Sequence, residues 1–234
     1  MRKQTMKLVF WLAVFAVISS LTSCTHVGGN SHTEAMRAYE AYDCVASLPT
    51  DSSKVRVKVS LENQMVYVLE QDQPLLVMPV TVGRASTPTP VGNFQIRAKN
   101  HYYRASTHGY ALKGDLIGEC YRKNLPSGWQ FRGTPMPYWC EFKTAYGFHT
   151  GWLKPFPASA GCLRMHKNVA PKFFRLVSVG TPVQISKSQP EDKTLGLNVP
   201  RPPDSTPFPP NPHRMMALTQ EFFTQHKVPT YHND

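Results

Sequence analysis

The sequence predicts a mainly β protein with one helix, and three observations support this prediction. The segment KVRVKVSL, from Lys54 to Leu61, alternates apolar and polar residues, which is the period-two pattern of a half-buried strand. Short apolar segments separated by turn residues continue from it to residue 98. Eight of the 21 prolines fall within residues 187–213, and this density excludes a regular core element there.

The order of the elements follows from the same patterns. QMVYVLE and LLVMPVTV complete an antiparallel meander with the first strand, and a further strand is expected from Asn93 to Ala98. Residues 100–135 are rich in Tyr, Gly, His and basic residues, and we expect an irregular insertion that covers one face. Strand character returns in MPYWCEF, AYGFH and, finally, TPVQIS.

A core helix is expected directly after the last cysteine, in NVAPKFFRLV. Asn168 can cap it, and Pro171 is tolerated in its first turn. Val169, Phe173 and Leu176 lie on one apolar stripe, so this helix should pack beside the segment that contains Cys162.

Four regions follow from composition. Residues 1–23 are expected to be a signal peptide, and residues 24–53 a tether with a short helix in SHTEAMRAYEAY. Residues 54–186 form the domain. Residues 187–234 form a proline-rich tail with a terminal helix in HRMMALTQEFFTQHK.

The N-terminal segment indicates export. Basic residues precede an apolar run from Leu8 to Ile18, which has the length of a signal-peptide core rather than a membrane span. The run ends in LTSC, which resembles a bacterial lipobox with Cys24 as the lipidated residue. An ordinary secretory signal is the alternative. The expectation is an exported protein that is lipid-anchored to a membrane and faces the periplasm or the cell wall.

The protein is basic. Its formal net charge is +11, and removal of residues 1–23 leaves 23 basic and 15 acidic residues, a net charge of +8. Such a charge favours anionic headgroups, nucleic acid or an acidic polymer such as the cell wall. The sequence has no basic run and no nucleic-acid-binding motif, and the expected compartment is wrong for nucleic acid, so that partner is excluded.

Cys162, in PASAGCLRM, has four possible roles: a buried thiol, half of a disulfide, a metal ligand or a nucleophile. An exported protein can form disulfides, and Cys120 and Cys140 flank the insertion, so we expect these two to pair, with Cys44 as the rival partner. The chain has neither a Cys-x-x-Cys nor a His-x-x-x-His motif, which argues against zinc.

The nucleophile interpretation has local support. A thiol at a turn, within reach of an imidazole such as His149, gains thiolate character. A glycine before the cysteine lets a substrate carbonyl approach the backbone closely. Most of the rate enhancement must then come from an oxyanion site and from substrate positioning.

At this point the residues resemble a known family. SAGCLRM is similar to the Ser-His-Gly-Cys-(Ile/Val)-Arg signature of the L,D-transpeptidase catalytic domain, the YkuD family, and GFHTGWLKPFPASAGCLRM resembles its short-loop version. The opening hairpin, TPTPVGNF and MPYW are also similar, in the family's order, over residues 54–186. The resemblance implies a β-sandwich or barrel with one helix beside the catalytic turn.

The resemblance also implies a reaction on peptidoglycan stem peptides. Cys162 would form a thioester with a donor tetrapeptide, and an amine of a neighbouring stem or of an attached protein would resolve it. His149 corresponds to the general base, and the carbonyl of Thr150 would orient its ring. Gly161 and Cys162 are candidate oxyanion donors. No cofactor and no metal is implied.

Other positions carry less specific expectations. Ser159 would hold the loop or contact substrate, and Arg164 would bind a substrate carboxylate or form a structural ion pair. Tyr138 would line the cleft or pack in the core. His108 and His166 are expected at the surface.

One residue departs from the family pattern, because Ala160 stands where a histidine is usual. Three functions stay open: a transpeptidase, a hydrolase that uses water on the same bond, and a non-catalytic peptidoglycan-binding lipoprotein.

Overall fold

A computed structural model describes residues 31–204, 219 and 228–232. The expected signal peptide, Cys24 and the expected terminal helix at residues 213–227 therefore lie outside the described residues, apart from position 219. Within the described part, none of the helices has the length and apolar character needed to cross a bilayer.

The predicted meander forms one side of the body, as a five-stranded sheet in the order β3-β2-β1-β12-β4. Strand β12 runs parallel to β1, and the other pairs are antiparallel. The alternating valines of β1 are buried, which confirms the period-two prediction. The strands are β1 (Val55–Ser60), β2 (Met65–Glu70), β3 (Gln73–Pro79), β4 (Gly92–Gln95) and β12 (Pro182–Ser186).

A second, four-stranded sheet has the order β11-β10-β9-β5. Strands β9 and β10 lie where MPYWCEF and AYGFH predicted them, and β10 pairs parallel with β11. The strands are β5 (Ala98–Asn100), β9 (Trp139–Lys143), β10 (Tyr146–Thr150) and β11 (Leu163–Met165).

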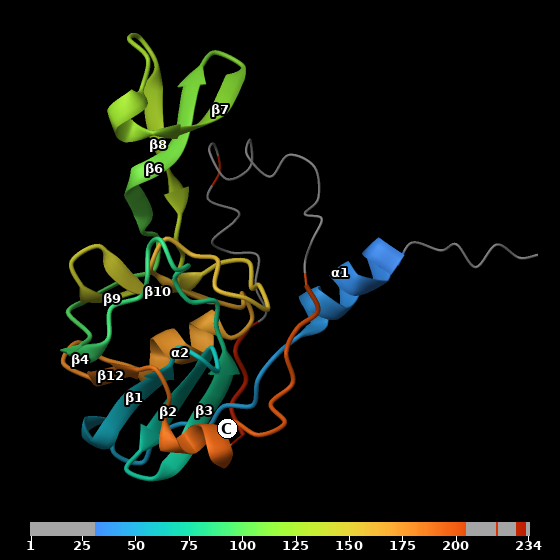
Figure 1. Ribbon diagram of the computed structural model, residues 1–234, viewed down its shortest axis with the longest axis vertical. Helices are drawn as coiled ribbons and strands as arrows, with labels where there is room; N and C mark the ends of the chain where they lie inside the picture. The colour runs from blue at the N-terminus through green and yellow to red at the C-terminus, as the bar shows by residue number, and fades with distance from the viewer. Residues whose placement is uncertain (1–30, 205–218, 220–227, 233–234) are drawn as a thin grey trace, which may run out of the picture.

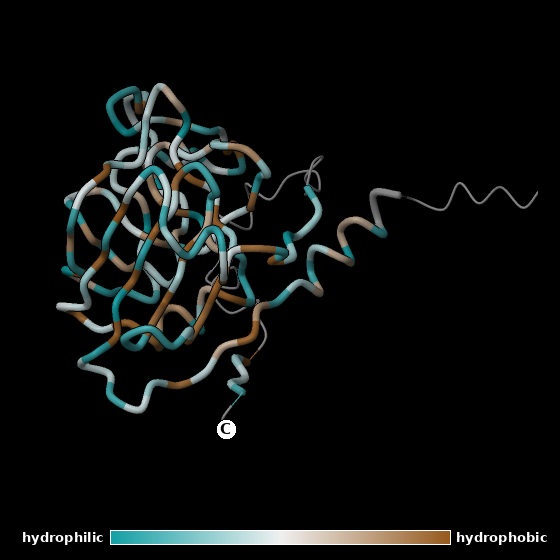
Figure 2. Tube along the Cα trace, turned by 60° about the horizontal axis from the view of Figure 1, so that its bottom comes forward, coloured by the Kyte–Doolittle hydropathy of each residue, from teal (hydrophilic) through white to brown (hydrophobic). Residues whose placement is uncertain are grey.

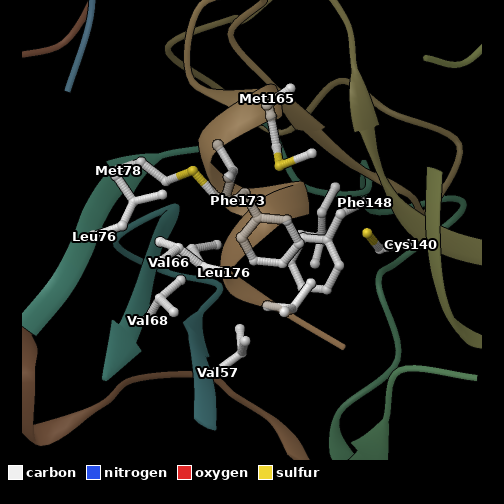
Figure 3. Close-up of a cluster of buried hydrophobic side chains, with 14 of the residues drawn as sticks. Val57, Val66, Val68, Leu76, Met78, Cys140, Phe148, Met165, Phe173 and Leu176 are labelled. Carbon is white, nitrogen blue, oxygen red and sulfur yellow. The ribbon is translucent and has the colours of Figure 1, made fainter. Parts of the chain in front are cut away.

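The helix α2 (Ala170–Leu176) lies between the two sheets (Figure 1). Its Phe173 and Leu176 lie among buried side chains of both sheets (Figure 3). Phe173 packs against Phe148 of β10 with ring centroids 4.6 Å apart. The helix confirms the prediction, including Pro171 in its first turn. Asn168, however, is not the cap: Val169 occupies that position, and the Asn168 amide instead donates to the carbonyl oxygens of Glu40 and Tyr42.

The expected irregular insertion is instead an ordered three-stranded antiparallel sheet, in the order β7-β6-β8, which projects from the body (Figure 1). Most side chains of β7 are exposed, so the sequence lacks the apolar alternation that predicts a half-buried strand. A Cβ at Gly109 would lie 2.2 Å from the Arg132 carbonyl oxygen, so the pairing with β8 depends on that glycine. The elements are β6 (Arg104–Lys113), β7 (Leu116–Tyr121), a 3₁₀ turn η2 (Arg122–Asn124) and β8 (Gln130–Pro135).

The expected disulfide between Cys120 and Cys140 is wrong for this structure. The described cysteines, Cys44, Cys120, Cys140 and Cys162, are all free thiols. Cys140 is fully buried in β9, whereas Cys120 lies in β7 of the projecting sheet, opposite Gly109. The two thiols belong to different sheets, so closeness in sequence did not indicate closeness in space.

Segments on both sides of the family-like region contact the body. The helix α1 (Ser31–Ala41) extends away from it, but the C-terminal end of α1 joins it (Figures 1 and 2). Tyr39 is only 1% exposed, and Ala46 forms a bridge with Leu76 of β3. Beyond β12, the turn η3 (Pro190–Lys193) contacts β2, where the Tyr67 hydroxyl donates to Asp192 at 2.6 Å. A short turn, η1 (Ser52–Lys54), precedes β1.

Candidate active site

Parallel pairing of β10 and β11 brings the two principal candidates together. Phe148 pairs with Leu163 and His149 with Arg164, so Cys162 lies beside Gly147 at the start of the pair. Alternation along the strands sends Phe148 and Leu163 into the core. His149 and Cys162 therefore lie on the opposite face, one diagonal step apart on neighbouring strands, although thirteen residues separate them in the sequence.

His149 is held in one tautomer. Its Nδ1 lies 2.7 Å from the carbonyl oxygen of Thr150. A carbonyl oxygen only accepts, so Nδ1 carries the proton and Nε2 has a free lone pair. Burial lowers the pKa of His149 to about 3; the bond to Thr150 opposes this shift, and the nearby Arg164 and His108 add to it. The ring is therefore neutral at physiological pH.

The Cys162 thiol is partly buried against Ala105, Met136, Trp139 and Tyr103. Burial raises its pKa, and the charge of Glu141 adds to this rise. The backbone N–H of Gly147 and the charge of Arg164 act in the opposite direction. The resting thiol is thus protonated, and it needs a base such as the Nε2 of His149 to become a nucleophile.

Ser159 braces the turn that carries the thiol. Its Oγ donates to the Cys162 carbonyl oxygen at 2.5 Å and accepts from the Gly161 N–H at 3.0 Å. Ser159 is 1% exposed, so it holds the loop and does not face a ligand. Because the Gly161 N–H already donates to Ser159, the Cys162 N–H is the remaining candidate of the two expected oxyanion donors.

Gly161 is required by its conformation and by its surroundings. Its φ is +114°, which favours glycine, and a Cβ there would lie 2.5 Å from the Tyr146 ring. The loop after β3 supports the same turn: the Thr89 hydroxyl donates to the Gly161 carbonyl oxygen at 2.9 Å, and the Arg84 N–H donates to that of Ser159. The sequence indicated TPTPVGNF only as a segment similar to the family, and no pattern assigned Thr89 this contact.

Arg164 lies on the same face as Cys162 and His149. Its side chain is half-buried, and its guanidinium donates a long hydrogen bond, 3.5 Å, to the Ala158 carbonyl oxygen. Among the described residues no carboxylate lies within ion-pair distance of it. The structural ion pair that was one of the two expectations is therefore not formed here.

The burial of Tyr138, His166 and His108 decides between the roles expected for them. Tyr138 is 6% exposed and packs on His101, with centroids 4.2 Å apart, so it is a core aromatic residue. His166 is not at the surface: it is 1% exposed, and its Nε2 lies 2.8 Å from the Tyr39 carbonyl oxygen. His108 is half-buried in β6 and acts electrostatically on His149, so it too is not a simple surface residue.

Tyr39 was not predicted as a site residue, yet it supports the loop between His149 and Cys162. Its hydroxyl accepts from the Leu153 N–H at 3.0 Å. Its ring packs on His166 and Trp152, with centroids 4.6 and 5.3 Å away. No local pattern marks this tyrosine, because its partners lie more than 110 residues later in the chain.

The described residues contain no group of three or more His, Cys, Asp or Glu side chains placed to hold a metal ion. The groups placed so far on this face are a thiol, a neutral imidazole with a free nitrogen, and an arginine that forms no ion pair with a described carboxylate.

Comparison with known protein families identifies the class of this domain. The family model of the L,D-transpeptidase catalytic domain (YkuD) matches residues 54–185, more than half of the chain. The chain therefore belongs to the YkuD family of L,D-transpeptidase catalytic domains, which acts on peptidoglycan peptides. No curated protein sequence matches.

Solved structures of the same kind are similar to this chain at low identity. An L,D-transpeptidase from Stackebrandtia nassauensis is 18% identical, with a TM-score of 0.43 and 69% of each chain covered. One from Enterococcus faecium is 23% identical with a TM-score of 0.42, covering 57% of this chain and 50% of that one. One from Mycobacterium smegmatis is 17% identical with a TM-score of 0.44, covering 57% and 58%. This chain thus spans little more than half the length of the last two.

Proposed function

We propose that this protein is a peptidoglycan L,D-transpeptidase that works through a Cys162 thioester. The observation that carries the proposal is the tautomer of His149, whose free Nε2 belongs to a ring on the same face as the thiol. Membership of the YkuD family supplies the substrate class.

The reaction has two halves. In acylation, His149 Nε2 takes the thiol proton, and the sulfur attacks the diaminopimelate carbonyl of a donor stem tetrapeptide. The carbon–nitrogen bond to the terminal D-alanine breaks, and the proton passes from His149 to the leaving amine. In the second half, an amine of a neighbouring stem or of an attached protein attacks the thioester, and Cys162 recovers its proton through His149.

Burial of the site opposes removal of the thiol proton by His149 and favours its later return. Protonated His149 is disfavoured by burial, so the ring returns its proton readily once the leaving amine forms. The charge of Arg164 stabilises the thiolate, and its guanidinium can pair with a substrate carboxylate in two hydrogen bonds. Ala160 removes the usual family imidazole but leaves the Cys162–His149 pair unchanged.

We also propose that the enzyme is exported and lipid-anchored through Cys24, facing the periplasm or the cell wall. The support is the N-terminal sequence, in which a basic segment, a short apolar core and LTSC follow one another. Two attached acyl chains give stable membrane attachment, whereas a single chain gives only marginal binding.

Intact-mass analysis tests the proposal. The full-length protein should gain the mass of the acyl group after incubation with a wall tetrapeptide, and that of a carbapenem after incubation with the drug. Cys162→Ser should form no thioester with either. Equal labelling of this variant and the wild type would exclude Cys162 as the nucleophile.

Product analysis then separates the three functions. Digestion of purified sacculi should produce new cross-linked dimers. Shortened stems without dimers would instead identify a hydrolase, and binding to sacculi without any product would identify a binding protein.

A further inference from the structure

Glu141 lies in the same row of the sheet as the thiol. In the β9–β10 pair it is opposite Gly147, and Gly147 is in turn the neighbour of Cys162. The flanking residues of β9, Cys140 and Phe142, point into the core. Alternation therefore places the Glu141 carboxylate on the face that carries Cys162 and His149.

No Cβ stands between the carboxylate and the thiol, because the middle residue of the row is a glycine. The tip of the Trp139 indole fills that position, since a Cβ at Gly147 would lie 2.7 Å from it. Trp139 stacks on Tyr103 with ring centroids 4.5 Å apart, and both pack in the cluster that includes Cys162. The buried Trp139 ring thus packs over Gly147, and the half-buried Tyr103 ring stacks on it.

Glu141 forms no ion pair with any described residue, although the protein is strongly basic. Three neighbouring cations have other partners. Lys143 lies over the Tyr146 ring, Arg97 donates to the Thr144 hydroxyl, and Lys99 donates to the Val177 carbonyl oxygen. The carboxylate is half-exposed and open to an external cation.

This carboxylate opposes the first half of the reaction. Burial is the main cause of the raised pKa values of Cys162 and Tyr103, and the charge of Glu141 adds to both rises, so Glu141 lies within electrostatic reach of both groups. A negative charge beside a nucleophilic thiol disfavours the thiolate. We therefore expect the Glu141 carboxylate to act in a later step of the reaction.

We propose that Glu141, with the half-buried ring of Tyr103 beside it, binds the ammonium group of the amine acceptor in the second half of the reaction. This inference rests on the proposed transpeptidase function. A carboxylate and aromatic faces together are a favourable environment for an ammonium ion, through a charge-assisted hydrogen bond and cation–π attraction.

The position suits the chemistry. Two strand spacings, about 10 Å, separate the backbones of Glu141 and Cys162. The acceptor ammonium would bind between the ends of these two side chains. The bound ammonium releases one proton to solvent and becomes the attacking amine. Its nitrogen bonds to the thioester carbon, the carbon–sulfur bond breaks, and the second proton passes through His149 to the sulfur.

The test compares the two halves of the reaction in full-length Glu141→Gln protein. Acylation is followed with nitrocefin, a β-lactam that carries no amine, and with a wall tetrapeptide whose side-chain amine is acetylated and which can act only as a donor. Transfer is followed as dimer formation from the unmodified tetrapeptide. Glu62→Gln, in the exposed turn after β1, is the matched control.

Glu141→Gln should acylate at least as fast as the wild type near pH 7, because the thiol loses a neighbouring negative charge. Its half-saturating concentration of acceptor should rise about tenfold, the usual effect of losing one charged contact. Hydrolysis of the acyl-enzyme should be unchanged, so the ratio of hydrolysis to transfer rises. Glu141→Asp should retain part of the wild-type transfer.

Other results would overturn the inference. Unchanged dimer formation would exclude Glu141 as the acceptor site. A parallel loss of acylation with nitrocefin and with the acetylated donor would show a structural or donor-binding role. If the wild type formed no acyl-enzyme at all, the proposed function itself would fail, which is a distinguishable outcome.

Discussion

The Nδ1 atom of His149 lies 2.7 Å from the carbonyl oxygen of the next residue, Thr150. This contact within one strand decides which ring nitrogen is free, and parallel pairing with β11 decides that Cys162 is its neighbour. Two local features of the backbone thus prepare a protonated thiol and an unprotonated base on the same face.

Replacing the base should separate binding from chemistry. His149→Asn should reduce the rate of acylation by a carbapenem about 100- to 10,000-fold, because the thiol is then left without a proton acceptor. Stopped-flow loss of the β-lactam absorbance measures this rate. A variant that acylates at the wild-type rate would show that another group deprotonates Cys162.

Removing the brace of the catalytic turn should affect both stability and rate. Ser159→Ala leaves the Gly161 N–H and the Cys162 carbonyl without their partner, so the free energy of unfolding should fall by about 1–3 kcal/mol. Acylation should slow because the sulfur is less well positioned. Urea unfolding and acylation kinetics measure the two effects, and Ser188→Ala, at an exposed position, is the control.

Tyr39→Phe removes one hydroxyl and leaves the ring in place. The buried Leu153 N–H then has no acceptor, and the expected loss is about 1–3 kcal/mol of unfolding free energy. Acylation should also slow, because Leu153 lies in the loop that joins His149 to Cys162. Tyr121→Phe, on an exposed side chain of β7, should change neither quantity. If Tyr39→Phe changed the unfolding free energy and the acylation rate no more than Tyr121→Phe, the Tyr39 hydroxyl would have no role in the loop.

Stability should fall with acidification because of buried neutral histidines. Burial lowers the pKa of His166 to about 4, whereas an unfolded histidine titrates near pH 6.5. Between these values the unfolded state binds the extra proton. The stabilisation from neutral His166 is therefore complete above about pH 6.5 and is lost as the pH falls toward 4, at about 1.4 kcal/mol per pH unit.

Unfolding experiments between pH 7.5 and 4.5 check this slope. The unfolding free energy of His166→Gln should depend less steeply on pH, because about one proton fewer is taken up on unfolding. This variant should also be less stable than the wild type at pH 7. The same slope in both proteins would mean that His166 does not titrate between the folded and unfolded states as described.

The sequence predicted the strands and the helix whose apolar side chains pack in the main hydrophobic core. The valines of β1 and the apolar stripe of α2 alternate with polar positions, and both elements lie where expected. The projecting sheet was not predicted, because β7 is exposed on most positions and has no alternation to detect. Residue types at fixed positions in a motif indicated Cys162 and His149 as candidates, and parallel pairing accounts for their proximity.

Other parts of the site depend on contacts between distant segments. His166 looked like a surface residue because its burial comes from Tyr39, which is 127 residues earlier in the chain. Glu141 drew no attention because its place beside Cys162 depends on the register of three strands. Local patterns contain neither kind of information.

The packing of Tyr39 also has a practical consequence for the definition of the domain. The family match begins at residue 54, but Tyr39, Ala46 and the carbonyl groups that hold Asn168 all precede it. A truncated protein that started at the family boundary would lose these contacts and expose the underside of the catalytic loop. We therefore expect the smallest part of this chain that folds on its own to begin within α1, some fifteen residues before the homologous region.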